Sequence, residues 1–384
     1  MYKLKDVCTI IAGQSPESKY YNTNGDGIPF FQGKADFGEL YPTVRVYCSK
    51  PTKIAEKNDI LLSVRAPVGP TNLAPCKVCI GRGLTAIRPA ETLDLKYLLF
   101  FFRYFEVQLQ QKGTGTTFKA ITQDVIKNLE IPVPPLEDQH RIVTRIEELF
   151  SQLDSGVETL KKTKEQLKVY RQAVLKEAFE AVKKDSILYN VEDVCNDIKV
   201  GIVIKPSQYY TSEDNSIGAF RSANVREFSV NDSEWVYLTN DGHQANQRSE
   251  IHTGDVLVVR SGYPGTACVV PPKYNGYNAI DILIAVPNMT KIVPDYLCAY
   301  TNSPLGRKIV QEKKRGVAQA HFNVSGYSKT PIIVPSIDIQ KKVVEIIESR
   351  LSVCDSIEKT IDTALQEAEA LRQSILKQAF EGGL

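Results

Sequence analysis

The sequence predicts an α/β protein of mixed α+β character, with two globular domains and two long antiparallel helices in one chain of 384 residues. Three observations lead to this prediction. A stretch of 50 residues occurs twice, each copy has the pattern of one long helix, and the two remaining segments carry similar landmarks in the same order. A chain of this length also exceeds one ordinary hydrophobic core, which favours two or more domains.

The repeat relates residues 131–180 to residues 332–381 at a constant shift of 201 positions, with 18 identities and no gap. Unrelated sequences of average composition would share roughly three. Both copies open on a Val-Pro step, at Val133-Pro134 and Val334-Pro335, and both close on Ala-Phe-Glu. The match indicates an internal duplication, from which a pseudo-two-fold arrangement like that of a homodimer is expected.

Each copy has the pattern of a helix of about 45 residues. Proline can begin a helix but not continue one, and Pro134-Pro135 is followed by a long stretch without proline. Apolar residues then recur at alternating steps of four and three, which is typical of a coiled-coil seam. The helix-pairing residues expected in this seam are Ile146, Phe150, Leu153, Leu160, Leu167, Val174, Ile347, Leu351, Ile361, Leu365 and Ile375.

Four charged residues interrupt the seam, namely Lys164, Arg171, Glu358 and Arg372. A charged residue in a seam can fix the register of two helices at some loss of stability. Long charged side chains can equally snorkel out of a narrow apolar stripe, and both interpretations stay open. Neither helix could bury its stripe alone, so we expect the two helices to pack against each other antiparallel.

The two globular segments read as mixed strand and helix. Short β-branched runs bounded by Gly and Pro recur, as in Asp59–Val64 and Asp255–Val259, and each run is followed by an arginine, Arg65 or Arg260. The similar short motifs keep the same order in both segments, while the sequences between them differ. This pattern indicates two copies of one domain that have the same kind of function but act on two different targets. The expected boundaries are residues 1–133, 134–184, 185–334 and 335–384 for the first domain, first helix, second domain and second helix.

Composition excludes several classes of protein. The formal charge of +2 decides nothing about partners, because nucleic-acid binding needs a local basic surface. No apolar run approaches the roughly 20 residues of a membrane span, and the start lacks the pattern of a signal peptide, so no membrane association and a cytoplasmic location are expected. The eight cysteines read as reduced core thiols. The pair Cys76 and Cys79 has metal-ligand spacing but no second pair, so no metal site is expected.

No catalytic motif emerges. Walker, His-Glu-x-x-His and Gly-x-Ser-x-Gly patterns are absent, and no Asn or Asp precedes Pro-Pro-Tyr/Phe. Ordinary surface or capping roles fit the four histidines, His140, His243, His252 and His321. One loose pattern, Asp295 with Glu312-x-Lys314, is similar to a nuclease site with two acids and a lysine around a metal. Its counterpart in the first domain, Gln110-x-Lys112, lacks the second acid, which favours chance composition.

The start of the first helix carries a specific resemblance. The string Pro134-Pro135-Leu136-Glu137-x-Gln139-x-x-Ile142, in the order domain, helix, domain, helix, resembles the specificity subunits of Type I restriction-modification systems across essentially the whole chain. The string from Asp59 to Gly69 and the loop Gly113-Thr-Gly are similar to the target-recognition domains of that family. The second copy departs from the pattern, with Ser336-Ile337-Asp338 in place of Pro-Leu-Glu.

The resemblance implies a sequence-specific DNA-binding subunit without a catalytic centre of its own. Each target-recognition domain would read one half of a bipartite, asymmetric site in double-stranded DNA, and the helices would set the spacing between the halves. The helices would also dock two modification subunits that methylate adenine, and motor-nuclease restriction subunits would join them for cleavage. S-adenosylmethionine, ATP and Mg²⁺ are then expected only in those partner subunits, and no cofactor in this chain.

Reading bases in the major groove requires Arg or Lys for guanine and Asn or Gln for adenine, with phosphate contacts that hold the register. Loops that end strands can present such residues, and glycines let backbone N–H groups approach phosphate closely. In the first domain the expected DNA-binding residues are Gln32, Lys34, Arg65, Arg82, Lys112, Gly113, Thr116, Thr117 and Lys119. In the second they are Arg221, Asn224, Arg260, Tyr263, Lys313, Lys314, Arg315, Gln319 and His321.

Two alternative functions follow from other features of the sequence. A metal-dependent nuclease would use Asp295, Glu312 and Lys314. A coiled-coil scaffold would use the long helices to bring proteins together without touching DNA. Metal-dependent cleavage by the isolated chain would favour the first alternative. Failure to retain any duplex, at every salt concentration and with partners present, would favour the second.

Overall fold

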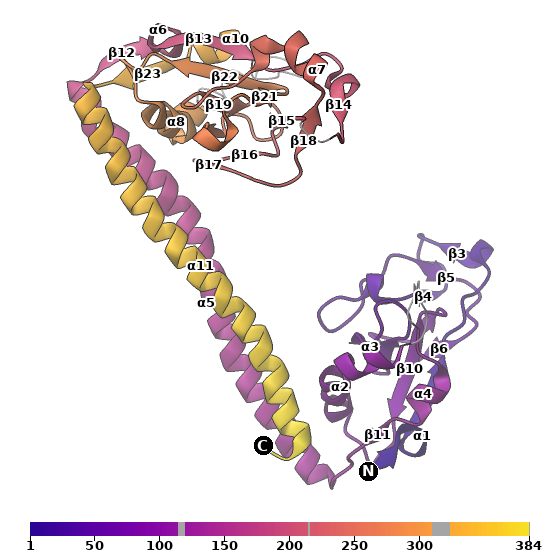
Figure 1. Ribbon diagram of the computed structural model, residues 1–384. Helices are drawn as coiled ribbons and strands as arrows, with labels where there is room; N and C mark the ends of the chain where they lie inside the picture. The colour runs from indigo at the N-terminus through magenta and orange to yellow at the C-terminus, as the bar shows by residue number, and fades with distance from the viewer. Residues whose placement is uncertain (114–119, 214–215, 309–322, 384) are drawn as a thin grey trace. The chain divides into compact units, whose positions relative to one another are not determined.

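The structure is a computed structural model that describes residues 1–113, 120–213, 216–308 and 323–383 (Figure 1). The chain divides into two compact units. Unit 1 holds residues 1–160 and 362–384, and unit 2 holds residues 161–361. Each unit therefore contains one globular domain together with part of each long helix.

The domain of unit 1 is built from two main sheets. The first is antiparallel, and its order is β2(Cys8–Ala12), β10(Leu84–Pro89), β7(Ile60–Ser63), β8(Thr71–Leu73). The second contains one parallel pair, β4 with β9, and its order is β3(Tyr21–Asn22), β5(Tyr47–Cys48), β4(Ile28–Phe31), β9(Val78–Ile80), β6(Ile54–Ala55). The remaining elements of this domain are β1(Tyr2–Lys3), α1(Leu4–Val7), α2(Leu95–Tyr104), α3(Glu106–Lys112), α4(Gln123–Lys127) and β11(Glu130–Ile131).

The domain of unit 2 repeats this plan. Its first sheet has the order β13(Cys195–Val200), β22(Ile282–Pro287), β19(Val256–Val259), β20(Ala267–Val269). Its second has the order β14(Tyr210–Thr211), β18(Val236–Leu238), β15(Ile217–Phe220), β21(Asn278–Ala279), again with one parallel pair, β15 with β21. The remaining elements are β12(Ile187–Asn190), α6(Val191–Val194), β16(Val225–Arg226), β17(Ser229–Val230), α7(Asn240–Ala245), α8(Pro294–Asn302), α10(Val324–Ser328) and β23(Pro331–Val334).

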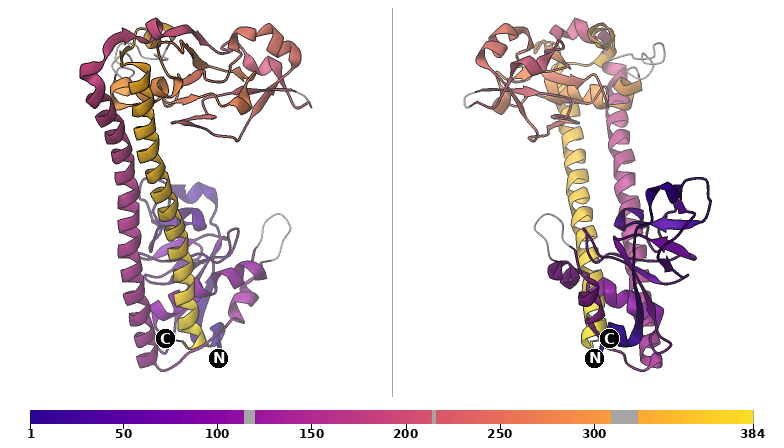
Figure 2. Two further views of the ribbon diagram at one scale, coloured as in Figure 1. Left: turned by 60° about the vertical axis from the view of Figure 1, so that its left-hand side comes forward. Right: turned by 90° about the vertical axis from the view of Figure 1, so that its right-hand side faces the viewer.

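The two repeated segments form α5(Leu136–Val182), of 47 residues, and α11(Ile337–Glu381), of 45 residues. At 1.5 Å per residue each helix is about 70 Å long. In unit 2 Arg171 lies 2.7 Å from Asp355, and Glu177 lies 2.7 Å from Arg350. Because one residue number rises as the other falls, the helices run antiparallel, as Figure 2 shows. The predicted fold, with two mixed domains and an antiparallel helix pair, is confirmed.

The eleven residues expected in the seam are all removed from full exposure, seven of them buried and four partly buried. The four charged seam residues all form ion pairs between the helices. Arg171 contacts both Asp355 and Glu358, Lys164 lies 3.6 Å from Glu358, and Arg372 pairs with Asp154 in unit 1. Of the two interpretations of these charges, cross-helix pairing fits the geometry, and pairing of this kind fixes the register of the helices.

Both helices contribute side chains to each domain core. In unit 1 Ile146 of α5 and Ile375, Leu376 and Ala379 of α11 belong to the cluster that holds the aromatic residues of α2. In unit 2 the corresponding cluster includes Leu175 and Phe179 of α5 and Ile347 and Leu351 of α11. Each domain is therefore attached to the helix pair by shared hydrophobic packing as well as by the polypeptide chain.

A buried glutamine fastens the start of each helix to its domain. Gln139 is fully buried, accepts a hydrogen bond from the Asp94 backbone N–H at 2.8 Å and donates to the carbonyls of Thr92 and Pro134. Gln340 is also fully buried, and its partners are the Val293 N–H and the carbonyls of Lys291 and Pro335. The same joint thus occurs once in each copy of the duplication.

Candidate nucleic-acid interface

Three strands of the first domain end at one pocket of about 660 Å³. Gln32 directly follows β4, Arg65 lies two residues after β7, and Arg82 lies two residues after β9. These three side chains and Lys34 are exposed and line the pocket. The structure therefore brings together four residues that the sequence analysis took from three separate segments of the chain.

Local hydrogen bonds shape the loops of this pocket. The Asp36 carboxylate accepts the Gln32 backbone N–H at 2.8 Å, and the Ser63 hydroxyl donates to the Pro67 carbonyl at 2.8 Å. At Gly83 an added Cβ would lie 2.2 Å from the Gln32 carbonyl oxygen, so this close approach of two chain segments requires glycine. Side-chain direction is thus set by backbone contacts on both sides of the pocket.

The charge around the pocket favours a negatively charged or electron-rich ligand. Lys34, Arg65 and Arg82 face a single acidic lining residue, Asp36, whose carboxylate is engaged by backbone N–H groups. Arginine and lysine donate to phosphate oxygens and to the N7 and O6 atoms of guanine. The lining is therefore suited to a nucleic-acid backbone or to a guanine edge.

Two further expected residues of the first domain lie at the end of α3. Lys112 is exposed at its last turn, and the Gly113 N–H donates to the Gln110 carbonyl at 3.3 Å. Ala120, where the described chain resumes, forms an isolated antiparallel bridge with Arg65. The end of this loop is thereby held beside the pocket. The expected residues Thr116, Thr117 and Lys119 lie outside the described residues.

The second domain places its expected residues differently. Tyr263 is 86% exposed, whereas Arg260 is largely buried and its guanidinium lies 2.6 Å from the Asp281 carboxylate. Arg221 is partly buried and donates to the Glu234 carbonyl. The remaining expected residues, Lys313, Lys314, Arg315, Gln319 and His321, lie outside the described residues.

Asn224 corrects one expectation. It was expected at the surface, but it is fully buried, and its amide joins parts of the same loop. Its oxygen accepts the Arg221 backbone N–H at 3.0 Å, and its nitrogen donates to the carbonyls of Asn231 and Ser233. An asparagine in a turn often bonds to nearby backbone in this way. Asn224 shapes the loop and has no free edge to offer a base.

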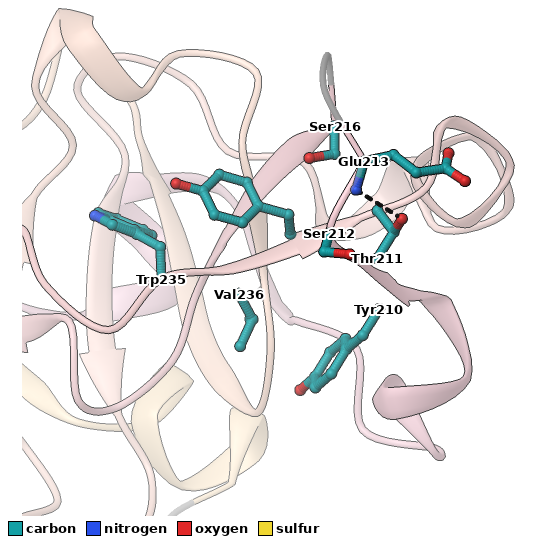
Figure 3. Close-up of a pocket in the computed structure, with 8 residues that line it drawn as sticks. Tyr210, Thr211, Ser212, Glu213, Ser216, Trp235 and Val236 are labelled. Atoms are coloured by element: carbon teal, nitrogen blue, oxygen red, sulfur yellow. Dashed lines mark hydrogen bonds between the residues drawn. The ribbon is translucent and has the colours of Figure 1, made fainter.

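A second pocket, of about 570 Å³, was not expected from the sequence (Figure 3). Tyr210 and Thr211 of β14 and Trp235, Val236 and Tyr237, beside and in β18, line it. The Glu213 backbone N–H donates to the Thr211 hydroxyl at 3.1 Å, which closes the loop at one side. The feature of the sequence that could have indicated this pocket is the aromatic content of the two strands. Aromatic residues in strands are, however, more often packed in a core.

Comparison with known proteins finds relatives of one kind. The Type I restriction modification DNA specificity domain matches residues 1–169. The specificity subunit of the Type I restriction enzyme EcoBI from Escherichia coli is 25% identical to the chain, over 99% of this chain and 85% of that protein. The chain is therefore similar over nearly its whole length to a specificity subunit of a Type I restriction-modification system.

Other relatives match over a shorter part of the chain or at lower identity. The putative MjaX specificity subunit from Methanocaldococcus jannaschii is 42% identical over 43% of the chain, and the match spans only 38% of that relative. A crystal structure of the Type I restriction-modification S subunit from M. genitalium is 16% identical over 99% of this chain and 95% of that chain, with a TM-score of 0.41.

The acidic pattern considered for a nuclease receives little support from the structure. Asp295 lies in the first turn of α8 and lines a pocket with Glu348 and Asp355, and burial raises the pKa of Asp295. A carboxylate that binds a metal ion must be ionised, and a raised pKa works against ionisation. Glu312 and Lys314 lie outside the described residues.

Within the described ranges the chain has no cluster of three or more His, Cys, Asp or Glu side chains placed to hold a metal ion. Cys76 is exposed, Cys79 is buried, and both are free thiols. Across the same ranges no helix combines the length and the apolar character that crossing a bilayer requires.

Proposed function

We propose that this specificity subunit reads a bipartite DNA site, one half with each domain, while the paired helices set the distance between the halves. The observation that carries the proposal is the duplicated fold with diverged loop ends. Both domains have the same order of strands in their first sheet, whereas equivalent strands of the second sheet lead to different side chains, as with Arg82 after β9 and Asp281 after β21. Two copies of one scaffold with unlike loops are suited to two unlike half-sites.

The pocket of the first domain supports direct reading of DNA. Gln32, Lys34, Arg65 and Arg82 can donate to base edges and phosphates from one surface. Tyr263, Arg260 and Arg221 are the corresponding candidates in the second domain, together with the loop set around Lys313. The loop set around Lys112 belongs to the first domain. The first reading unit would end near residue 133, and the second would run from near residue 184 to near residue 334.

Substitution of the strand-end arginines should separate the two halves of the site. We expect Arg65→Ala to weaken base selection in one half only, by about 1–3 kcal/mol if Arg65 makes a bidentate base contact. Arg260→Ala should weaken base selection in the other half, because Arg260 holds the Asp281 carboxylate in place. The measurement is retention of randomised duplexes by the complex with its modification subunits, followed by sequencing. Arg45→Ala, an exposed arginine outside the pocket, is the control. Equal loss in both halves would contradict independent reading.

We also propose that the helices dock the modification subunits, and α11 carries a surface suited to this role. Ile346, Val353 and Ile357 of α11 are 50%, 57% and 40% exposed, and their spacing of seven and four residues places them along one side of the helix. We call these three residues the apolar stripe. Nearby, Arg350 pairs with Glu177 of α5. The core side of α11, which carries Ile347 and Leu351, is buried in the unit 2 cluster, so the stripe lies apart from the domain core.

The apolar stripe provides a direct test of docking. Its counterparts at the shift of 201 positions are polar or small, namely Arg145, Gln152 and Gly156. Val353→Glu should reduce the modification subunits retained per chain from two toward one, because a buried valine contributes roughly 1.5–3 kcal/mol and a charge opposes burial. Native mass measurement gives the stoichiometry, and Gln152→Glu is the matched control. Full retention by the Val353→Glu chain would remove the stripe from the docking surface.

A further inference from the structure

Backbone hydrogen bonds define which residues correspond in the two domains. In the first domain β4 and β9 are parallel, and the Gly81 N–H donates to the Phe31 carbonyl at 2.8 Å. In the second β15 and β21 are parallel, and the Ile280 N–H donates to the Phe220 carbonyl at the same distance. The residue that follows is Arg82 in the first domain and Asp281 in the second. One position of the duplicated scaffold thus carries opposite charges.

The surroundings of this position differ accordingly. In the first domain Arg82 is exposed and shares the pocket lining with Arg65. In the second domain the Asp281 carboxylate lies 2.6 Å from the guanidinium of Arg260, the residue that follows the equivalent strand. The Ser261 hydroxyl lies 3.4 Å from its other oxygen. The first site therefore presents two cations, and the second presents an acid held by a cation.

The geometry of Asp281 fixes its carboxylate at the surface. Its backbone has a φ of 51°, in the left-handed region, which aspartate tolerates better than most residues. Its side chain is 40% exposed, whereas that of Arg260 is 13% exposed. The arginine therefore lies beneath and the acid faces outward. A conformation that is costly for an ordinary residue is retained here at the end of a strand, beside a loop set proposed to read DNA.

We propose that Asp281 is a specificity-determining residue of the second domain, accepting a hydrogen bond from the exocyclic amino group of cytosine or adenine, while Arg82 donates to guanine at the equivalent position of the first. This inference rests on the proposed function. A carboxylate only accepts and repels phosphate, so at a DNA surface it suits an amino group in the major groove, as on cytosine N4. Arg260 holds the carboxylate in place. Arg82 can donate only, which suits guanine N7 and O6.

Selection from randomised duplexes by the complex with its modification subunits tests this assignment. Asp281→Asn keeps the shape and removes the charge, so the base accepted at one position of one half should change, with a roughly 5- to 150-fold change in relative retention. The other half should keep its sequence. Asp232→Asn is the control, because Asp232 forms a comparable surface ion pair with Lys273 in the same domain. Arg82→Asp should alter one position of the opposite half.

Each outcome separates the inference from the function on which it rests. An unchanged sequence profile with Asp281→Asn, or an equal loss at every position, would assign the Arg260–Asp281 pair a purely structural role and overturn the inference. If Asp281→Asn prevents folding, the Arg82→Asp chain decides, and an unchanged profile there also overturns it. A wild-type complex that selects no split sequence overturns the proposed function itself.

Discussion

Lengthening both helices by one heptad is expected to shift the preferred gap between the two half-sites to a larger value, with both half sequences unchanged. Duplication of residues 160–166 in α5 and of residues 361–367 in α11 keeps the seam pattern. Seven residues add about 10.5 Å to each helix. This corresponds to roughly three base pairs at 3.4 Å each. Methylation mapping of DNA treated with the complex would give the gap directly.

The added base pairs also rotate one half-site about the duplex axis by roughly 100°, since about 10.5 base pairs make one turn. Binding at the new gap should therefore be weaker than wild-type binding at the original gap, because the DNA must twist. A heptad placed in α5 alone is the control, since it displaces the pairing of Arg171 with Asp355 and should impair assembly. An unchanged gap in the chain with both insertions would show that the helices are not the ruler.

Replacement of the buried glutamine Gln340 by leucine is expected to lower the free energy of unfolding of the second unit by about 2–5 kcal/mol. The substitution leaves the Val293 N–H and the carbonyls of Lys291 and Pro335 without their partners in a buried place. Each unpaired buried group costs about 1–3 kcal/mol, less any relaxation of the chain. The joint between the start of α11 and its domain should loosen first.

The single tryptophan of the chain makes this measurement specific to one unit. Trp235 packs against Phe220 at 4.9 Å and Tyr274 at 5.3 Å between ring centroids, so its fluorescence reports unfolding of the second domain. Denaturant titration of Gln340→Leu should move the Trp235 transition. Gln139→Leu, the same change in the first unit, should leave that transition nearly in place. If both chains match wild type, the glutamines do not hold the joints.

The helices could be predicted in detail because their signals are local and repeated. Prolines mark the starts, the spacing of four and three marks the seam, and α5 and α11 begin within two residues of Pro135 and Pro335. The sequence left the role of the seam charges undecided between register and snorkelling. Only three-dimensional proximity shows that Arg171 faces Asp355 and Glu358, because these residues are distant in the chain.

The candidate interface was predictable where strand ends and charge coincide, as at Arg65 and Arg82. The prediction for Asn224 was wrong because an asparagine in a turn can form hydrogen bonds with the backbone of its own loop. Residue type alone does not distinguish such an asparagine from one that contacts a base. The sequence does not predict a role for Asp281, because the segments Ile80-Gly-Arg82 and Ala279-Ile-Asp281 share no sequence similarity. Their correspondence lies in backbone pairing, which only the strand register exposes.

The shared packing between helices and domains has a consequence for synthesis on the ribosome. Ile375, Leu376 and Ala379 belong to the same hydrophobic cluster as Leu4 and Val7, nearly the full length of the chain apart. The amino-terminal domain emerges first but cannot close its core until translation has passed Ala379. Meanwhile the exposed aromatic face of α2 is available to chaperones, so the domain made earliest is among the last to finish folding.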